Sequence, residues 1–489
     1  MIPDLSGFRS GSGRLKGLRC IHTHLRGEPI SQDDHTDLAM LRLDLMVVLQ
    51  VDQRGIPALL HYAHLLPDNP QKRIWHSFEP KPLSALRIEF LDLIGALEDE
   101  FAHSYQIKGV KDERDRAVLI RVATSSKIRA EDSLRELETL AKSCKVEVLD
   151  SIIQKRAQID SRYVMGRGKL SELVIRCLQL SANLLIFDQE LSPAQVRSIS
   201  DFTELKIIDR TQLILDIFAQ RAKSREGKFQ VELAQLKYLL PRLITKNTAM
   251  SRLTGGIGGR GPGETKLEIN RRRVKDRIGR LKKELELISR RRRHCRSKRA
   301  KQGIAAISLV GYTNAGKSTL QNALTKSNVL SKDQPFTTLD PTSRKFRFSQ
   351  GQEAIITDTV GFIRDLPKDL VAAFSATLDE LKKADLLLHV VDVSDPNFKN
   401  HISAVEKTIE LLQLNRIPIV RIFNKEDKAD KDLVENYCRI YQAISISAKN
   451  IRSLIKLVKL IEPKLLPGAK KVEYLPGHTM EDLLLQNVI

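Results

Sequence analysis

The chain has 489 residues, a formal net charge of +21 at pH 7 and 42% hydrophobic residues. A single hydrophobic core seldom grows beyond about 250 residues, so this length predicts about three domains. The excess of Lys and Arg favours a polyanionic partner, because each cation that displaces a counterion adds non-specific attraction to phosphate.

Cysteine usage and hydropathy indicate the cellular compartment in which the chain is expected. The five cysteines are scattered and show no metal-type pairing, which is typical of a chain from a reducing cytoplasm: Cys20, Cys144, Cys177, Cys295 and Cys438. No uncharged run reaches the roughly 18 residues of a membrane helix, so neither a membrane span nor export is predicted. We expect a cytoplasmic, monomeric protein, with peripheral membrane association as an open alternative.

Residues 1–112 predict a folded α/β extension of unknown role, because 43–51 and 83–94 are apolar. The set His22, His24 and Asp34, with Ser31, resembles the zinc site of JAB/MPN metallopeptidase-like proteins. However, the spacing from His24 to Ser31 is one residue short of that pattern, and no upstream Glu is placed to act as a base. We therefore prefer a loop histidine pair before a helix capped by Ser31, and metal binding is the alternative.

In residues 113–223 predicted strands alternate with predicted helices. The predicted strands are 117–123, 146–149, 184–187 and 205–208, and the predicted helices are 130–144, 168–180 and 211–222. Such alternation favours a small parallel sheet.

Residues 224–301 change to a helical period. Apolar residues at 4-3-4-3 spacing predict an antiparallel helical hairpin with arms of about 18 residues: Phe229, Leu233, Leu236, Leu240 and Leu243, then Val274, Ile278, Leu281, Leu285 and Ile288. Residues 254–264 are too rich in Gly to pack a core and predict an exposed tip.

The second arm of this hairpin carries most of the excess charge, since 264–301 holds 17 Lys or Arg against 5 Asp or Glu. A solvated face is one interpretation, and a nucleic-acid surface is the one we favour. The candidate RNA-binding residues are Arg260, Arg271, Arg272, Arg273, Arg290, Arg291, Arg292 and Arg293.

Residues 302–463 begin with an apolar run that leads into Gly311-x4-Gly316-Lys317-Ser318. This spacing predicts a strand, a phosphate-binding loop and a helix whose N-terminus faces the same anion. Lys317 can reach the β- and γ-phosphates, and the Ser318 hydroxyl can bind Mg²⁺. A further strand end places Asp358 to hold Mg²⁺ through water and Gly361 to meet the γ-phosphate.

Two later motifs indicate guanine. Asn424-Lys-Glu-Asp427 follows a predicted strand at 417–423, and the Asp427 carboxylate fits the two donors of guanine, which adenine lacks. Ser447-Ala-Lys449 ends another strand and can back the guanine carbonyl. The expected nucleotide-binding residues are Gly311, Tyr312, Thr313, Asn314, Ala315, Gly316, Lys317, Ser318, Thr319, Asp358, Thr359, Val360, Gly361, Asn424, Lys425, Asp427, Ser447, Ala448 and Lys449.

Three stretches together carry a family resemblance: 207–222, 255–268 and 336–341. They resemble the HflX GTPases, which have an N-terminal α/β domain, a long helical hairpin and a P-loop GTPase domain. The resemblance implies binding of GTP, GDP and the large ribosomal subunit with its rRNA, and splitting or rescue of stalled ribosomes under stress. It leaves 464–489 as a short C-terminal segment.

The family pattern also suggests how hydrolysis is arranged. Thr338 is preferred over Thr337 as the switch threonine on Mg²⁺, because it precedes the fixed Leu-Asp-Pro. Lys317, Thr338 and Gly361 are then the catalytic set. Phe362 stands where many GTPases have a water-orienting Gln, so intrinsic hydrolysis should be slow and stimulated by ribosomes. Asn314 resembles the potassium ligand of cation-dependent GTPases, with a plain loop residue as the alternative.

Two classes of function remain. The first is a ribosome-associated GTPase, and the second is an RNA-binding or RNA-chaperone module in which nucleotide is only a structural or regulatory ligand. The set Lys317, Ser318 and Asp358 favours the first. An ATP-driven helicase is a weaker third interpretation, because Asn424 and Asp427 indicate guanine.

Overall fold

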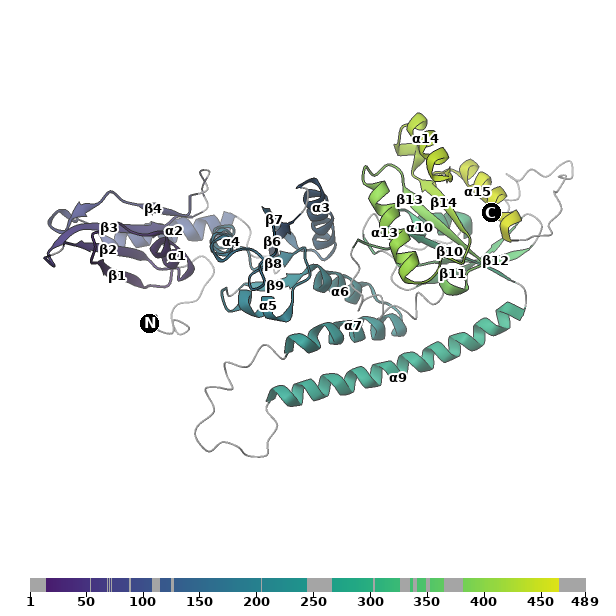
Figure 1. Ribbon diagram of the computed structural model, residues 1–489, viewed down its shortest axis with the longest axis horizontal. Helices are drawn as coiled ribbons and strands as arrows, with labels where there is room; N and C mark the ends of the chain where they lie inside the picture. Colours follow the sequence, from purple (N-terminus) through teal and green to yellow (C-terminus); the bar gives the residue numbers. More distant parts are fainter. Residues whose placement is uncertain are drawn as a thin grey trace. The chain divides into compact units, whose positions relative to one another are not determined.

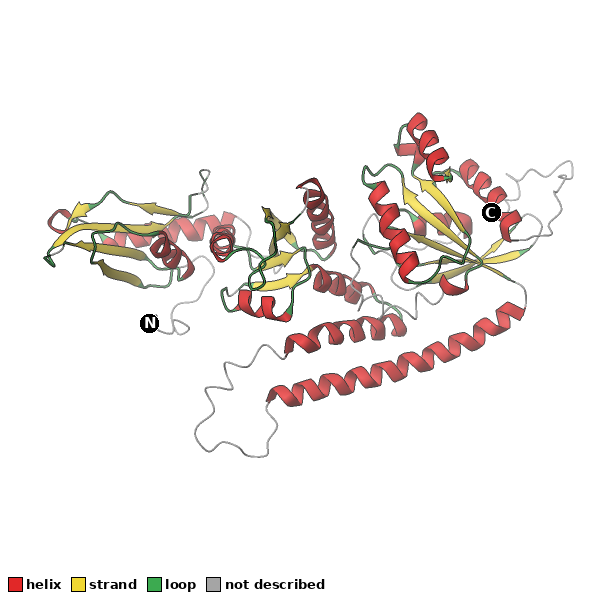
Figure 2. Ribbon diagram, in the orientation of Figure 1, coloured by secondary structure: helices red, strands yellow, loops and turns green. Residues whose placement is uncertain are grey.

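The computed structural model describes residues 15–52, 54–67, 69, 71, 73–87, 89–107, 115–124, 127–203, 205–243, 266–301, 304–325, 335–336, 341–348, 352–364 and 381–465. It divides into two compact units, Met1–Arg210 and Thr211–Ile489. Figure 1 labels the elements and Figure 2 distinguishes helices from strands. The five-part division expected from the sequence stays a prediction.

The first unit begins with a five-stranded sheet of order β1-β2-β3-β4, in which β5 also pairs with β3. Its strands are β1 (Arg19–His24), β2 (Leu45–Val51), β3 (Pro57–Leu65), β4 (Trp75–Ser77) and β5 (Lys81–Pro82). The helices are α1 (Gln32–Met40), the 3-10 helix η1 (Leu83–Ala85) and α2 (Phe90–Ile107). Leu38, Met46, Ala63 and Leu97 form its core, so this part folds as an α/β unit.

The histidine pair of this part is not in a loop. His22 and His24 both lie on β1, so the loop prediction is wrong. The predicted cap is confirmed: Ser31 is the N-cap of α1, its hydroxyl accepts from the Asp34 amide, and Asp34 completes a capping box. The spacing Ser31-x-x-Asp34 indicated the helix cap. The alternation of polar residues at His22 and His24 was too short to indicate a strand.

The second part of this unit is a parallel sheet of order β7-β6-β8-β9. Its strands are β6 (Arg116–Ala123), β7 (Glu147–Lys155), β8 (Leu184–Phe187) and β9 (Lys206–Asp209). Its helices are α3 (Lys127–Ser143), α4 (Arg167–Leu180) and α5 (Pro193–Ser200). The predicted parallel α/β domain is therefore confirmed. Sequence reasoning missed α5, although Ser192 and Gln195 form its capping box and Pro193 occupies its first turn.

The second unit contains the hairpin. α6 (Arg210–Arg221) starts at the boundary between the units, and α7 (Arg225–Leu243) then runs antiparallel to α9 (Lys266–Lys301), as Figure 1 shows. Arg277 holds the Glu232 carboxylate with two hydrogen bonds of 2.6 and 2.8 Å, and Arg225 lies 3.4 Å from Glu284. The hairpin is confirmed, but α9 has 36 residues and spans about 54 Å, twice the predicted arm.

The rest of the second unit is a six-stranded sheet of order β11-β12-β10-β13-β14-β15, parallel except for β11. The strands are β10 (Ala305–Gly311), β11 (Thr342–Arg347), β12 (Glu353–Asp358), β13 (Leu386–Asp392), β14 (Ile419–Asn424) and β15 (Ala443–Ser445). The helices are α10 (Lys317–Thr325), η2 (Leu381–Lys383), α13 (Phe398–Leu411), η3 (Glu426–Lys428), α14 (Lys431–Tyr441) and α15 (Ile451–Leu465).

Helices cover both faces of this sheet, because successive side chains of a strand point to opposite faces. Leu320 of α10 and Leu457 of α15 belong to one buried cluster, which includes Leu388 of β13. Phe398 of α13 and Val434 of α14 belong to the other, which includes Val391 of β13. The predicted P-loop architecture of α/β class is confirmed.

Candidate functional site

The candidate site lies at the carboxyl edge of the six-stranded sheet. β12, β10, β13 and β14 are adjacent and parallel, so their last residues meet at one edge. These residues are Asp358, Gly311, Asp392 and Asn424. In open α/β sheets ligands bind outside the carboxyl ends of the strands, so this edge is where a nucleotide is expected.

The loop from β10 to α10 needs its two glycines for packing. A Cβ on Gly311 would lie 2.2 Å from the Val390 carbonyl oxygen, because β13 passes against the loop. Gly316 has φ +88°, and a Cβ there would lie 2.3 Å from Nδ2 of Asn424. Any larger residue would displace the loop from its neighbouring strands, so the spacing of the glycines fixes the loop on the sheet edge.

Lys317 turns back into the loop that it follows. Its Nζ donates to the carbonyl oxygens of Gly311 at 3.0 Å and Tyr312 at 2.8 Å. Burial lowers the pKa of Lys317 to about 8, and the negative charge of Asp358 opposes this. The ammonium therefore lies at the position where phosphate oxygens would meet it, held by carbonyl groups that a phosphate can replace.

Ser318 and Asp358 form the candidate Mg²⁺ site. The Ser318 hydroxyl donates to Oδ2 of Asp358 at 2.6 Å, and Asp358 is fully buried. A hydroxyl and a carboxylate oxygen are hard ligands of the kind that Mg²⁺ prefers. The residues present thus fit the ion that GTPases generally use.

Gly361 lies against the same loop. A Cβ on Gly361 would lie 3.0 Å from Thr313 and 3.1 Å from Nζ of Lys317. The Thr313 amide donates to the Phe362 carbonyl at 2.8 Å, and the Phe362 amide donates to the Gly311 carbonyl at 3.0 Å. This ladder ties the segment after β12 to the phosphate loop. The Phe362 side chain is buried, at 3% exposure.

Asn424 connects three loops. Its Nδ2 donates to the Ala315 carbonyl at 2.9 Å, and its Oδ1 accepts from the Ala448 amide at 3.0 Å. The Ser453 hydroxyl also accepts from the Ser447 amide at 3.0 Å. In this structure Asn424 therefore positions the phosphate loop and the 447–449 turn, and its expected contact with guanine stays a prediction.

Lys425 and Asp427, which follow Asn424, have different surroundings. Nζ of Lys425 lies 2.6 Å from Oδ2 of Asp392, and Lys425 adopts a left-handed backbone with φ 63°. Asp427 in η3 and Lys449 are exposed beside this turn. Their carboxylate and ammonium groups remain accessible to a base.

Sequence reasoning missed β13 and the polar residues that it carries. Asp392 ends an apolar run just as Asp358 and Asn424 do, so the same strand-end rule would have found it. His389, in the middle of that run, is 1% exposed, and burial lowers its pKa to about 3, with Arg421 and Lys317 adding to this. No pattern in the sequence indicates that Tyr312 stacks on His401 with ring centroids 3.9 Å apart.

Several predicted site residues cannot be placed. Thr337, Thr338 and Arg260 lie outside the described residues, as do the side chains of Arg292 and Arg293. Arg271, Arg272, Arg273, Arg290 and Arg291 are exposed on α9. Asn314 is exposed in the phosphate loop with φ 63°, and its role as a potassium ligand stays a prediction.

Comparison with known proteins agrees with this geometry. Three family models match in chain order: "GTP-binding GTPase N-terminal" at 131–219, "GTP-binding GTPase Middle Region" at 221–299 and "50S ribosome-binding GTPase" at 306–425. A GTPase HflX of Alkalihalophilus pseudofirmus is 49% identical over 335 residues, which cover 68% of this chain and 79% of that protein. The chain belongs to the HflX family of GTPases.

Another HflX protein gives the same picture. The GTPase HflX of Escherichia coli is 46% identical over 316 residues, covering 65% of this chain and 74% of its own. This HflX-family chain is therefore a GTP-hydrolysing enzyme. The family models begin at residue 131, after the five-stranded sheet.

Solved structures are also similar to this HflX-family chain. A GTP-binding protein of Sulfolobus solfataricus in complex with GDP is 28% identical, with a TM-score of 0.37, covering 72% of this chain and 98% of that one.

No helix in the part of the chain that the structure describes has the length and apolar character to cross a membrane.

Proposed function

We propose that this GTPase binds the large ribosomal subunit and uses its GTP cycle to split or rescue stalled ribosomes, under stress in particular. The observation that carries the proposal is the direct connection of a long basic helix to the phosphate-binding strand. α9 ends at Lys301 and β10 begins at Ala305. The phosphate loop at the end of β10 and an RNA-bound helix are thus joined through a single strand.

The proposed GTP contacts follow from the positions at the sheet edge. The amides of the phosphate loop and the N-terminus of α10 surround the phosphates, and Lys317 leaves its two carbonyl partners to meet the β- and γ-phosphates. Asp427 accepts the two donors of guanine, with Lys449 beside it. Asn424 and Lys425 hold these loops in register.

Mg²⁺, when bound between Ser318 and Asp358, supplies charge that neutralises the phosphates. Opening the 2.6 Å hydrogen bond from Ser318 to Asp358 frees the hydroxyl for the ion and a carboxylate oxygen for a water molecule bound to the ion. Thr338 is the other proposed direct ligand from the chain. Gly361 sits next to Lys317, so its amide is placed to follow the presence or loss of the γ-phosphate.

Slow intrinsic hydrolysis is part of the proposal. The buried Phe362 side chain offers no polar atom to orient the attacking water. The ribosome then has to complete the site, which ties hydrolysis to the bound state and makes it a timer for release.

The proposed RNA contact is the exposed basic side of α9. Its apolar residue Leu281 is buried at 1% exposure, whereas Arg271, Arg273 and Arg291 are exposed. Such a face provides affinity and position through phosphates, with little choice of sequence. The Gly-rich segment 254–264, with Arg260, is the proposed tip that reaches the RNA surface.

The proposal is tested by measuring single-turnover GTP hydrolysis with and without purified large subunits, together with pelleting of the chain on those subunits. We expect faster hydrolysis with large subunits and pelleting that depends on a non-hydrolysable GTP analogue. Pelleting that is the same with GDP, the analogue and no nucleotide, without stimulation, would favour the RNA-binding module.

A further inference from the structure

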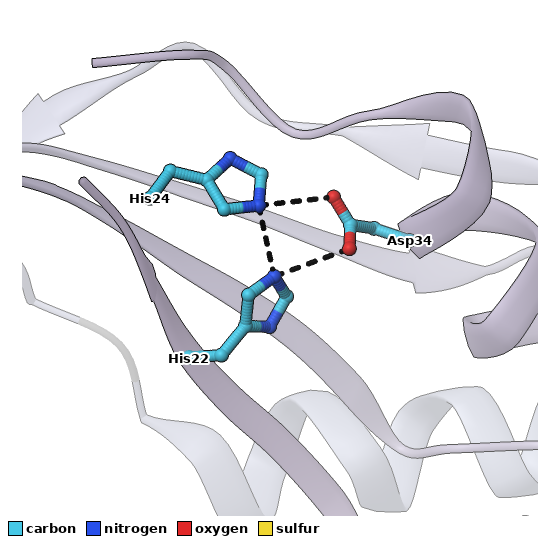
Figure 3. Close-up of side chains that lie close together, drawn as sticks. All are labelled: His22, His24 and Asp34. Atoms are coloured by element: carbon cyan, nitrogen blue, oxygen red, sulfur yellow. Dashed lines mark hydrogen bonds and ion pairs between the residues drawn. The ribbon is translucent and has the colours of Figure 1, made fainter. Parts of the chain in front are cut away.

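The five-stranded sheet of the first unit contains a cluster of side chains that the GTPase site does not use. His22 and His24 alternate by two along β1, so both project from the same face of the strand. Asp34 is in the first turn of α1, which starts after the loop that follows β1. Figure 3 shows the two rings and the carboxylate directed toward one another.

The distances in this cluster match those around a single metal ion. Nε2 of His22 lies 3.1 Å from Nε2 of His24 and 3.1 Å from Oδ1 of Asp34, and Nε2 of His24 lies 3.6 Å from Oδ2 of Asp34. Tetrahedral ligands at about 2.0–2.1 Å from a zinc ion lie roughly 3.3–3.4 Å from one another. The three observed separations bracket that value, and all ligand atoms lie within 4.8 Å of one another.

Hydrogen bonds contact all three groups from outside the cluster, and Nδ1 of His22 lies 3.7 Å from Sγ of Cys20. Nδ1 of His24 lies 3.1 Å from the Glu28 carbonyl oxygen and 3.2 Å from that of Pro29. A carbonyl only accepts, so Nδ1 carries the proton, and in a neutral ring the lone pair on Nε2 then faces the cluster. The Ser31 amide and hydroxyl both donate to Oδ2 of Asp34 at 2.7 Å, which fixes the carboxylate.

The lone pair of His24 faces a second imidazole nitrogen and a carboxylate, so either a proton or a metal ion lies between them. One candidate is the proton of a His22 ring that carries it on Nε2, from where it can be donated to His24 or to Asp34. The other is a metal ion, which accepts electron pairs from all three groups at once. The outward hydrogen bond from Nδ1 of His24 to a carbonyl is the usual arrangement of a metal-binding histidine.

The cluster is accessible to an ion from solution. The side chains of His22, His24 and Asp34 are 32%, 18% and 14% exposed. Among the described residues, no other group of three or more His, Cys, Asp or Glu side chains brings its ligand atoms this close together. Three protein ligands leave at least one coordination position, as in sites that keep a water molecule.

We propose that His22, His24 and Asp34 bind one divalent transition-metal ion of the zinc class, through Nε2 of both rings and an oxygen of Asp34, with a further position open to solvent. Two imidazoles and one carboxylate suit Zn²⁺ and its analogue Co²⁺ better than Mg²⁺, which prefers oxygen ligands alone. The ion would join the end of β1 to the first turn of α1.

The test uses the full-length chain without an affinity tag, stripped with a chelator and saturated with Mg²⁺ and GDP so that the GTPase site is filled. Zn²⁺ is then titrated, with competition by a chromophoric chelator, and Co²⁺ is added to a second sample to record its visible spectrum. We expect one ion per chain and intense Co²⁺ bands of a four- or five-coordinate site. The melting temperature of the metal-free chain should rise when Zn²⁺ is restored.

Two variants and one control identify the ligands. His22→Ala removes a partly exposed ligand, and Asp34→Asn keeps an oxygen that can accept from the Ser31 amide, so the cap survives. Both should lower Zn²⁺ affinity by about 100-fold or more. His76→Ala, on the exposed side of β4 in the same sheet, should bind Zn²⁺ as the unmodified chain does.

The proposal is overturned if the unmodified chain takes up no stoichiometric Zn²⁺ with Mg²⁺ and GDP present, which would leave the cluster as a set of hydrogen bonds. It is also overturned if both ligand variants keep the ion. The GTP hydrolysis rate should be the same in all four proteins, because the GTPase site does not use this cluster. Failure of the metal proposal therefore leaves the proposed ribosome function untouched.

Discussion

We expect base recognition to depend on the exposed carboxylate of Asp427. Asp427→Asn replaces an acceptor that fits both donors of guanine with an amide that fits the extra oxygen of xanthine. We expect GDP affinity to fall by about 10³- to 10⁴-fold and XDP affinity to rise. Fluorescent nucleotide binding measures both. Asp432→Asn, an exposed carboxylate at the start of α14, is the matched control. An Asp427→Asn variant with unchanged guanine affinity would remove Asp427 from the site.

Lys317 in the phosphate loop should make proton uptake on GDP binding depend on pH. Burial lowers the pKa of Lys317 to about 8, from 10.5. Above pH 8 the nucleotide-free chain therefore loses the proton from this ammonium, whereas bound phosphates favour the charged form and hold its pKa higher. GDP binding at about pH 8.5 should then take up a proton, and binding at about pH 7 should not. Calorimetry in two buffers of different ionisation enthalpy measures this uptake, and equal observed heats in the two buffers at about pH 8.5 would contradict it.

At the scale of residues, the sequence located the loops that meet at the nucleotide but not how they support one another. Gly311 and Gly316 were indicated by spacing, yet the structure shows that Val390 and Asn424 are what require them. That requirement depends on which strands are adjacent in the sheet. Local sequence does not contain strand order, which is also why the contact of Lys425 with Asp392 could not be predicted.

The hairpin should depend on one buried leucine. Leu281 is 1% exposed in α9, whereas Leu287 on the same helix is 52% exposed. Leu281→Ala should cost about 2–5 kcal/mol of packing and reduce hydrogen-exchange protection of the α7 amides. Leu287→Ala makes the same chemical change and should leave that protection intact. If the α7 amides are equally protected from hydrogen exchange in both variants, this leucine does not hold α7 and α9 together.

The basic face of α9 should govern salt dependence. Removing Arg290 and Arg291 together should weaken binding to large subunits and flatten the log–log salt slope by roughly 0.7–0.9 for each phosphate that is no longer neutralised. Removing Lys431 and Arg439, two exposed cations of α14, is the control for net charge. An unchanged slope in the α9 variant would show that this face is only solvated.

At the scale of elements, periodicity predicted structure well wherever a pattern was long. Apart from β7, which continues to Lys155, and α5, which was missed, the strands and helices of 117–222 lie within three residues of their predicted bounds, because alternating apolar runs determine them. The helix α9 is longer than predicted, since its apolar spacing stops near Ile288 while the helix continues through a basic stretch to Lys301. Charged residues such as Arg and Lys favour helix without marking a face, so no apolar period indicates the last turns.

At the scale of the whole molecule, the family and the order of its parts could be predicted from motifs alone. For residues 15–107 the α/β class was predicted but the strand order was not, because β1 pairs with β2 across the helix α1 and no motif indicates this pairing. In that region the helix cap at Ser31 was predictable from local spacing, whereas the strand that carries His22 was not. β1 pairs with β2 in a register that joins Arg19 to Leu45, a contact between residues distant in the chain.

We propose that GTP chemistry in this chain is coupled to the state of the ribosome. The most direct test of this coupling is sedimentation of intact ribosomes through a sucrose gradient after incubation with the chain and GTP, a non-hydrolysable analogue or GDP. We predict conversion of ribosomes into subunits with GTP and with the analogue, the chain remaining on the large subunit with the analogue, and little conversion with GDP. Ribosomes that stay intact with every nucleotide, while the chain binds them equally in each case, would contradict the claim.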